Sequence, residues 1–89
     1  MKCEVKYSKK AVRQIKKLDK YTQIMLLNWI SKNLINCTNP FEHGKALDGN
    51  LKNLWRYRIG DYRIITKIYD DSLIILVLTV GHRRDVYAQ

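Results

Sequence analysis

The sequence predicts an α+β fold in which two N-terminal helices pack on one face of a mainly antiparallel four-stranded β-sheet. Apolar residues recur at helical spacing over the first half of the chain and alternate with polar residues over much of the second half. Between two alternating runs, Gly60-Asp61 has the composition of a two-residue hairpin turn. The 89 residues suffice for one hydrophobic core, so we expect a single domain over residues 1–89.

The N-terminal residues predict a short strand and a basic helix. Apolar and polar side chains alternate from Cys3 to Tyr7, which is typical of a strand with one buried face. Ser8 can cap the helix that follows, where Ala11, Ile15 and Leu18 recur at helical spacing. Lysines and arginines fill the rest of this helix and are most simply a solvated face.

A second, more apolar helix is expected after Asp19, which can cap it. Its expected apolar stripe consists of Tyr21, Ile24, Leu27, Ile30 and Leu34, widened by Met25, Leu26 and Trp29. Pro40 and the turn-forming residues around it end this helix and predict a long connection up to about Asn50.

The C-terminal half predicts three antiparallel strands, at 54–59, 62–69 and 73–80. A turn at Asp70-Asp71 or Asp71-Ser72 would join the last two. With the first of these turns, one face of the last strand carries Ile74, Leu76, Leu78 and Val80, and the helix face carries Leu73, Ile75, Val77 and Thr79. Because both faces of this strand are apolar, we expect it to be central.

The hairpin register separates basic and apolar side chains. A two-residue loop at Gly60-Asp61 places Arg58 opposite Arg63. The face turned to the helices then carries Trp55, Tyr57, Ile59, Tyr62, Ile64, Thr66 and Ile68, and the other face carries Arg56, Arg58, Arg63 and Lys67. Like charges opposite each other destabilise a sheet, and no acidic residue shares this face of the hairpin, which favours an external phosphate as counterion. The alternative is that the long arginine stems splay apart into solvent.

Composition agrees with a polyanionic partner. Lysine and arginine number 17 against 8 acidic residues, a formal charge of +9. Cys3 and Cys37 are isolated, so we expect two reduced thiols, with no disulfide framework, metal site or cofactor. The N-terminus lacks the apolar core of a signal peptide, and the run from Leu73 to Leu78 is too short to cross a bilayer. We therefore expect a cytoplasmic protein that does not bind membranes.

The last residues add candidates for the basic face. Gly81 permits a bend that could bring Arg83 toward Arg58 and Arg63. Tyr87 could stack on a base or only cover the core, and His82 could assist a reaction or only form a surface hydrogen bond.

Three stretches together resemble the RelE/ParE toxin superfamily in order and spacing. They are the basic helix pair, residues 51–63, and the terminal Val-Gly-His-Arg-x-x-Val-Tyr motif at residues 80–87. Residues 47–63 follow the pattern Leu-x-Gly-x-Leu-x-x-Leu-Trp-Arg-Tyr-Arg-x-Gly-x-Tyr-Arg. The resemblance spans nearly the whole chain.

The resemblance implies a messenger-RNA endonuclease that often acts on codons in the ribosomal A site. It also implies a cognate antitoxin that is acidic and partly disordered. The protein would bind operator DNA only as part of the complex with this antitoxin. By position, the basic catalytic residues of the family correspond to Arg56 and Arg58, the phosphate-binding arginine to Arg63, the general acid to Arg83 and the base-stacking tyrosine to Tyr87. We add Lys52, Lys67 and Arg84 as further RNA contacts, and His82 as a possible assisting group.

The chain departs from the best-known pattern in its first hairpin strand. Well-studied ribosome-dependent members carry lysines there, whereas this chain has Arg56 and Arg58, and a pKa above about 12 makes arginine a poor general base. Without visible metal ligands, attack by the RNA's own 2′-hydroxyl is the expected reaction. Two alternatives stay open: a DNA gyrase inhibitor of the ParE type, and a non-catalytic RNA- or ribosome-binding module.

Overall fold

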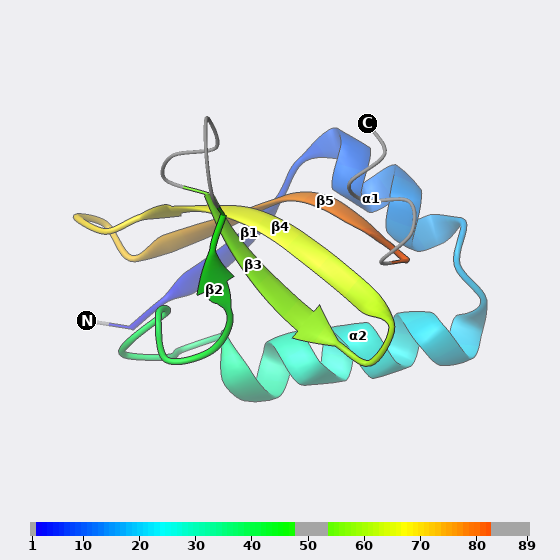
Figure 1. Ribbon diagram of the computed structural model, residues 1–89, viewed down its shortest axis with the longest axis horizontal. Helices are drawn as coiled ribbons and strands as arrows, with labels where there is room; N and C mark the ends of the chain where they lie inside the picture. The colour runs from blue at the N-terminus through cyan, green and yellow to red at the C-terminus, as the bar shows by residue number, and fades with distance from the viewer. Residues whose placement is uncertain (1, 48–53, 83–89) are drawn as a thin grey trace.

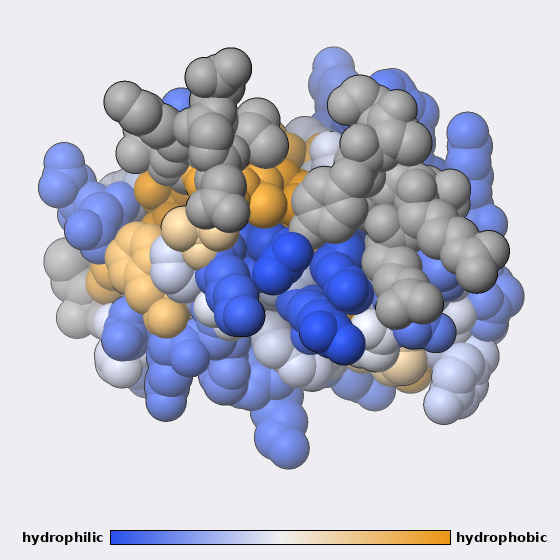
Figure 2. Space-filling model, viewed as in Figure 1, coloured by the Kyte–Doolittle hydropathy of each residue, from blue (hydrophilic) through white to orange (hydrophobic). Residues whose placement is uncertain are grey.

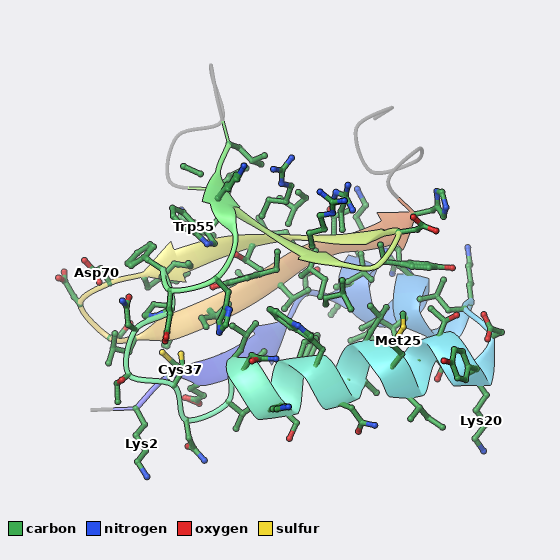
Figure 3. The ribbon with its side chains drawn as sticks, turned by 60° about the horizontal axis from the view of Figure 1, so that its bottom comes forward. Lys2, Lys20, Met25, Cys37, Trp55 and Asp70 are labelled. Atoms are coloured by element: carbon green, nitrogen blue, oxygen red, sulfur yellow. The ribbon has the colours of Figure 1, made fainter. Side chains whose placement is uncertain are left out.

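The computed structural model describes residues 2–47 and 54–82 and consists of one five-stranded sheet with two helices on one of its faces (Figure 3). The elements are β1 (Glu4–Tyr7), α1 (Lys9–Lys16), α2 (Lys20–Asn33), β2 (Lys45–Ala46), β3 (Leu54–Ile59), β4 (Tyr62–Tyr69) and β5 (Ile74–His82). The strand order is β1-β5-β4-β3-β2, and only the β1–β5 pair is parallel. Figure 1 shows α1 beside β5 and α2 lying along the β3 side of the sheet. Neither helix in this part of the chain is long and apolar enough to span a membrane.

The expected α+β class is confirmed, with one strand more than expected. The additional strand is β2, whose two residues pair with Arg56 and Trp55 of β3. It falls inside the segment that the sequence predicts as a connection. The sequence does not predict this strand, because two residues are too few to show a strand periodicity. What holds it is contact with β3: the indole Nε1 of Trp55 donates to the carbonyl oxygen of His43 at 2.6 Å.

Both predicted helix caps are present. The side chain of Ser8 accepts a hydrogen bond from the backbone N–H of Ala11 at 3.0 Å. The carboxylate of Asp19 accepts from the backbone N–H of Thr22 at 3.1 Å and from its hydroxyl at 2.6 Å. These bonds satisfy amide hydrogens that a first helical turn leaves unpaired, so each helix begins where the sequence indicates.

The apolar stripe predicted for α2 is partly wrong. The helix buries Thr22, Leu26 and Ile30, whereas Tyr21 is 77% exposed and Ile24 is 50% exposed. The reason is that apolar residues surround much of α2, so its composition does not say which side meets the sheet. The observed side is the one that also carries Trp29, whose ring centroid lies 5.7 Å from that of Tyr57 on β3. A row of apolar side chains is left facing outward.

The predicted hairpin register is confirmed at every position from Leu54 to Ile59, including Arg58 opposite Arg63. Gly60 has φ +59°, a backbone conformation that suits glycine at the first position of a two-residue loop. Tyr57 and Ile64 are fully buried on the helix side. The two faces of the hairpin therefore separate as the sequence predicts.

The predicted faces of the last strand hold only in its first half. β5 is central, between β1 and β4, and it buries Ile75 and Val77 against the helices as expected. The register then shifts, because Ile65 pairs with Thr79 and Thr66 with Val77. Leu78 is thus an extra residue that no β4 residue opposes, as in a β-bulge.

The bulge moves Val80 to the helix face, where it is 2% exposed, and Thr79 to the arginine face, contrary to the expectation. Backbone groups in and beside the bulge form hydrogen bonds with side chains at the start of α1 and within it. The hydroxyl of Ser8 donates to the carbonyl oxygen of Leu78 at 3.0 Å, and the side-chain oxygen of Gln14 accepts from the backbone N–H of Val80 at 2.7 Å. Partners so distant in the sequence could not be anticipated from the strand pattern.

The turn before β5 is also longer than expected. Tyr69 pairs with Ile74, which leaves four residues in the loop, and Leu73 there has φ +52°. Of the two predicted turns, the one centred on Asp71-Ser72 gives this pairing. The two cysteines are free thiols, as expected, and the backbone N–H of Cys3 donates to the carbonyl oxygen of Cys37 at 2.6 Å.

Candidate functional site

The face of the sheet turned away from the helices carries a cluster of cationic side chains, which we call the basic face. It consists of Arg56 and Arg58 on β3 and Arg63 and Lys67 on β4. Figure 2 shows strongly hydrophilic side chains gathered over β3 and β4, beside a hydrophobic area of the same face. The strand alternation places all four on this side, because the alternate residues Tyr57, Ile64 and Thr66 are buried in the core on the other side.

Arg63 is the most deeply placed member, at 8% exposed. One of its terminal nitrogens, Nη1, donates to the carbonyl oxygens of Tyr62 at 3.2 Å and of Gly60 at 3.4 Å. Its Nε is buried and has no hydrogen-bond partner among the described residues. The guanidinium is thus held against its own hairpin turn, and its Nε has no acceptor within residues 2–47 and 54–82.

Arg63 has one direct neighbour on each flanking strand. Across β3 it faces Arg58, which is exposed, and across β5 it faces Gly81, which has no side chain. Arginine donors are arranged in a planar fork that matches the oxygens of a phosphate. A phosphate oxygen near this pair would offset the repulsion between the two guanidinium groups and give the Nε of Arg63 an acceptor.

Carboxylates are sparse around the basic face. The residues of β3 and β4 on this side include no aspartate or glutamate, and Glu4 shares the face only at β1, beyond β5. Ile65, at 8% exposed, lies between Arg63 and Lys67. Apolar surroundings lower the local dielectric and strengthen the attraction of an anion to the arginines.

Lys67 and His82 each contact an aromatic ring. The Nζ of Lys67 is 5.2 Å from the ring centroid of Tyr69, a cation–π contact at the distal end of the hairpin. His82 pairs with Tyr62, and the two rings meet edge to face at 5.6 Å. Because opposed residues share a face of a sheet, His82 lies on the helix side and not beside Arg63.

Four of the predicted site residues fall outside the described ranges: Lys52, Arg83, Arg84 and Tyr87. Their roles stay predictions. In the described part of the chain there is no cluster of three or more histidine, cysteine, aspartate or glutamate side chains suited to a metal ion.

The sequence pattern missed three residues next to the basic face: Trp29, His43 and Lys45, which line a cavity together with Arg56 and Arg58. These residues are far from the arginines in the sequence and have no regular spacing, so no pattern indicated that they would lie together. Only Gly44, between two of them, hints at a turn, and its φ of +80° is a conformation that favours glycine.

The sequence is similar to those of known toxins. Residues 5–87 match the profile of the ParE toxin of the type II toxin–antitoxin system parDE. A putative RelE-like toxin protein from Escherichia coli is 31% identical over 98% of this chain and 92% of its own length.

Two solved structures are similar in fold over nearly the whole chain. A chain of the toxin–antitoxin complex RelBE2 from Mycobacterium tuberculosis has a TM-score of 0.83 and 26% identity, covering 96% of this chain and 95% of that one. A chain of the archaeal RelE–RelB complex from Pyrococcus horikoshii has a TM-score of 0.68 and 25% identity, covering 97% of this chain and 100% of that one.

Proposed function

This chain belongs to the ParE toxin family within the RelE/ParE superfamily of type II toxin–antitoxin systems, and from that membership we propose that it is a metal-independent endoribonuclease acting on messenger RNA. One observation carries the proposal: Arg63 is buried opposite Arg58 with an Nε donor that has no partner in the described structure. This arrangement costs stability in the free protein and is suited to a phosphate diester.

The proposed reaction uses the substrate's own nucleophile. The 2′-hydroxyl oxygen forms a bond to the adjacent phosphorus as the bond from phosphorus to the 5′-oxygen breaks, which gives a 2′,3′-cyclic phosphate and a free 5′-hydroxyl. Arg63 and Arg58 hold the non-bridging oxygens in line and stabilise their charge, which requires no reorganisation of the site during the reaction.

The remaining roles are assigned by position. Arg56 neutralises charge developing on the attacking oxygen, whose proton passes to solvent, because an arginine is a poor general base. Arg83 protonates or neutralises the leaving 5′-oxygen, and Tyr87 stacks on a base. Lys52, Lys67 and Arg84 contact neighbouring phosphates. Because His82 lies on the helix side, we leave it out of the reacting set.

The proposed cellular setting is the cytoplasm, with mRNA in the ribosomal A site as substrate and a cognate antitoxin as inhibitor. Similar folds occur in toxin–antitoxin complexes. Tyr21, Ile24 and Leu27 form an exposed apolar row on α2, next to an apolar groove of about 210 Å³ lined in part by Val12 of α1. An acidic, partly disordered antitoxin could lay a helix there and direct its carboxylates to the arginines.

A second candidate function is inhibition of DNA gyrase, favoured by the name of the matching family, ParE. Such a toxin would act by binding a protein and would not need the buried Arg63 opposite Arg58. Primer extension on cellular mRNAs after brief induction separates the two. Cuts within reading frames support the ribonuclease, whereas intact transcripts together with DNA damage would contradict it.

A further inference from the structure

A cavity of about 390 Å³ lies at the outer edge of β3, next to the basic face. It is lined by Trp29, His43, Gly44, Lys45, Arg56 and Arg58. Its volume is within the range of about 300–1,000 Å³ that is typical of small-molecule sites. None of these six lining residues is a carboxylate, and three carry a positive charge.

The cavity exists because β2 is short. β2 pairs with β3 only as far as Lys45 opposite Arg56, so Arg58, two residues farther along β3, lies past the end of β2. Before β2, the chain turns toward α2 at Gly44 (Figure 1). The edge of β3 at Arg58 is therefore open to a ligand.

The part of the lining formed by residues 43–45 is packed closely against β3. A Cβ atom on Gly44 would lie 2.2 Å from the carbonyl oxygen of Arg56, so the backbone there is in close contact with β3. The carbonyl oxygen of His43 accepts from the indole of Trp55 at 2.6 Å. The ring of His43 meets the ring of Trp29 edge to face, with 5.7 Å between centroids. A rigid wall needs little ordering when a ligand binds.

The lining combines two kinds of chemistry. Trp29 and His43 present aromatic rings, on which a nucleobase can stack, and such stacking contributes about 1–3 kcal/mol per base. Lys45, Arg56 and Arg58 present cationic donors for phosphate oxygens. A ligand that carries both a flat ring and a phosphate is a nucleotide.

We propose that this cavity is a nucleotide subsite, which binds the nucleotide next to the scissile phosphate of the RNA strand. The inference rests on the proposed ribonuclease function, because Arg58 lines the cavity and also faces Arg63. Arg56 and Arg58 are two residues apart on one strand, roughly 6.6–6.8 Å along it. This spacing allows Arg58 to contact the reacting phosphate while Arg56, beside the attacking 2′-oxygen, contacts the nucleotide at the mouth of the cavity.

The test measures binding separately from cleavage. A single-stranded RNA with 2′-fluoro sugars, which lacks the attacking hydroxyl, is titrated into the full chain while two-dimensional NMR follows the indole of Trp29, the ring of His43 and the Nε–H of Arg63. Adenosine 5′-monophosphate is the second probe. The test variant is the double substitution Lys45→Gln with His43→Ala, and the matched control is Lys32→Gln, an exposed lysine on α2 outside the cavity.

We expect both probes to shift the Trp29 and His43 signals. We expect the double variant to weaken RNA binding by about tenfold or more, because it removes one charge-assisted contact and one of the two rings on which a base can stack. The control should bind RNA as the unmodified chain does. Should the RNA shift only the Arg63 signal and bind the double variant normally, the subsite is wrong and the ribonuclease proposal stands. If adenosine monophosphate binds in the cavity while neither RNA binding nor cleavage is detected, the ribonuclease proposal is wrong. The proposal that the cavity binds a nucleotide of an RNA strand is then wrong as well.

Discussion

Arg58 and Arg63 lie directly opposite each other across the β3–β4 hairpin, and only Arg58 is exposed. Two guanidinium groups on opposed residues of a sheet repel each other. The Nε of Arg63 is also buried and has no hydrogen-bond partner in the described structure. A sheet that served only as a scaffold would gain stability by losing either charge. This is the basis of our proposal that the counterion of the pair arrives with the substrate.

The first prediction is that Arg63→Met detoxifies the protein without destabilising it. Methionine keeps most of the apolar stem but removes the charge and the unsatisfied Nε. The loss of two hydrogen bonds to the turn is offset by the removal of the repulsion from Arg58 and of the buried Nε. We therefore expect the free energy of unfolding to stay equal or to rise by up to about 1 kcal/mol. Growth assays and thermal unfolding measure the two effects. Arg13→Met, an exposed site on α1, is the matched control and should change the stability by less than about 0.5 kcal/mol.

A toxic Arg63→Met protein would remove Arg63 from the centre of the mechanism. A loss of more than about 1 kcal/mol would instead show that its contacts with Gly60 and Tyr62 support the fold.

A second prediction compares two glycines that both have positive φ. At Gly60 a Cβ would meet no atom within 4 Å, whereas at Gly44 it would meet the carbonyl oxygen of Arg56 at 2.2 Å. We expect Gly60→Ala to lower the free energy of unfolding by about 1–2 kcal/mol, because alanine is strained at a positive φ. Gly44→Ala should cost more, because the 43–45 segment must also move away from β3. Chemical denaturation measures both, and equal costs would contradict the close packing of Gly44.

The third prediction concerns alkaline pH. Tyr57 is fully buried and its hydroxyl donates to the carbonyl oxygen of Pro40 at 2.5 Å. Burial, aided by the nearby thiols of Cys37 and Cys3, raises the pKa of Tyr57 above its usual value. The neutral phenol is therefore favoured in the folded state, and its contribution to stability is present below pH about 10 and is lost as the pH rises beyond it.

Tyr57→Phe should lower the free energy of unfolding at pH 7 by about 1–2 kcal/mol, because the Pro40 carbonyl loses its donor. Above pH 10 the difference between the two proteins should shrink. Unfolding curves at pH 7, 9 and 11 test this, and a constant difference would mean that Tyr57 ionises equally in both states.

The sequence could predict those features that depend on neighbouring residues. The caps at Ser8 and Asp19 and the Gly60 turn are local, and once the turn is fixed the register of the arginines follows from strand alternation. The central position of β5 follows in the same way from apolar residues on both its faces.

Other features depend on contacts between distant segments and could not be predicted. The bulge at Leu78 depends on Ser8 and Gln14, more than sixty positions away. The side that α2 buries depends on where Trp29 meets Tyr57. The cavity wall at His43 is likewise set by Trp55 and has no pattern of its own. The gathering of the arginines on one face was thus predictable, and the aromatic residues beside them were not.

The fourth prediction concerns the two thiols. Burial, together with the neighbouring Cys3 thiol, raises the pKa of Cys37 to about 12. The two sulfur atoms lie side by side next to the Cys37 label in Figure 3. Because the thiolate is the reactive form, iodoacetamide should modify the folded protein slowly at pH 7.5 and the unfolded protein rapidly. Mass spectrometry of timed samples measures both rates, and similar rates would contradict the shielding of Cys37.

The last prediction asks whether the nucleophile belongs to the substrate. The proposed site positions and neutralises a phosphate but provides no group to activate an outside water molecule. An RNA with one 2′-deoxy sugar immediately 5′ of the scissile phosphate should therefore bind with similar affinity, since the arginines contact phosphate oxygens, and yet resist cleavage. Activity on free RNA should persist in EDTA. Cleavage of the deoxy substrate would assign the attack to water, and inhibition by EDTA would require a metal ion, so either result would overturn the roles given to Arg56 and Arg83.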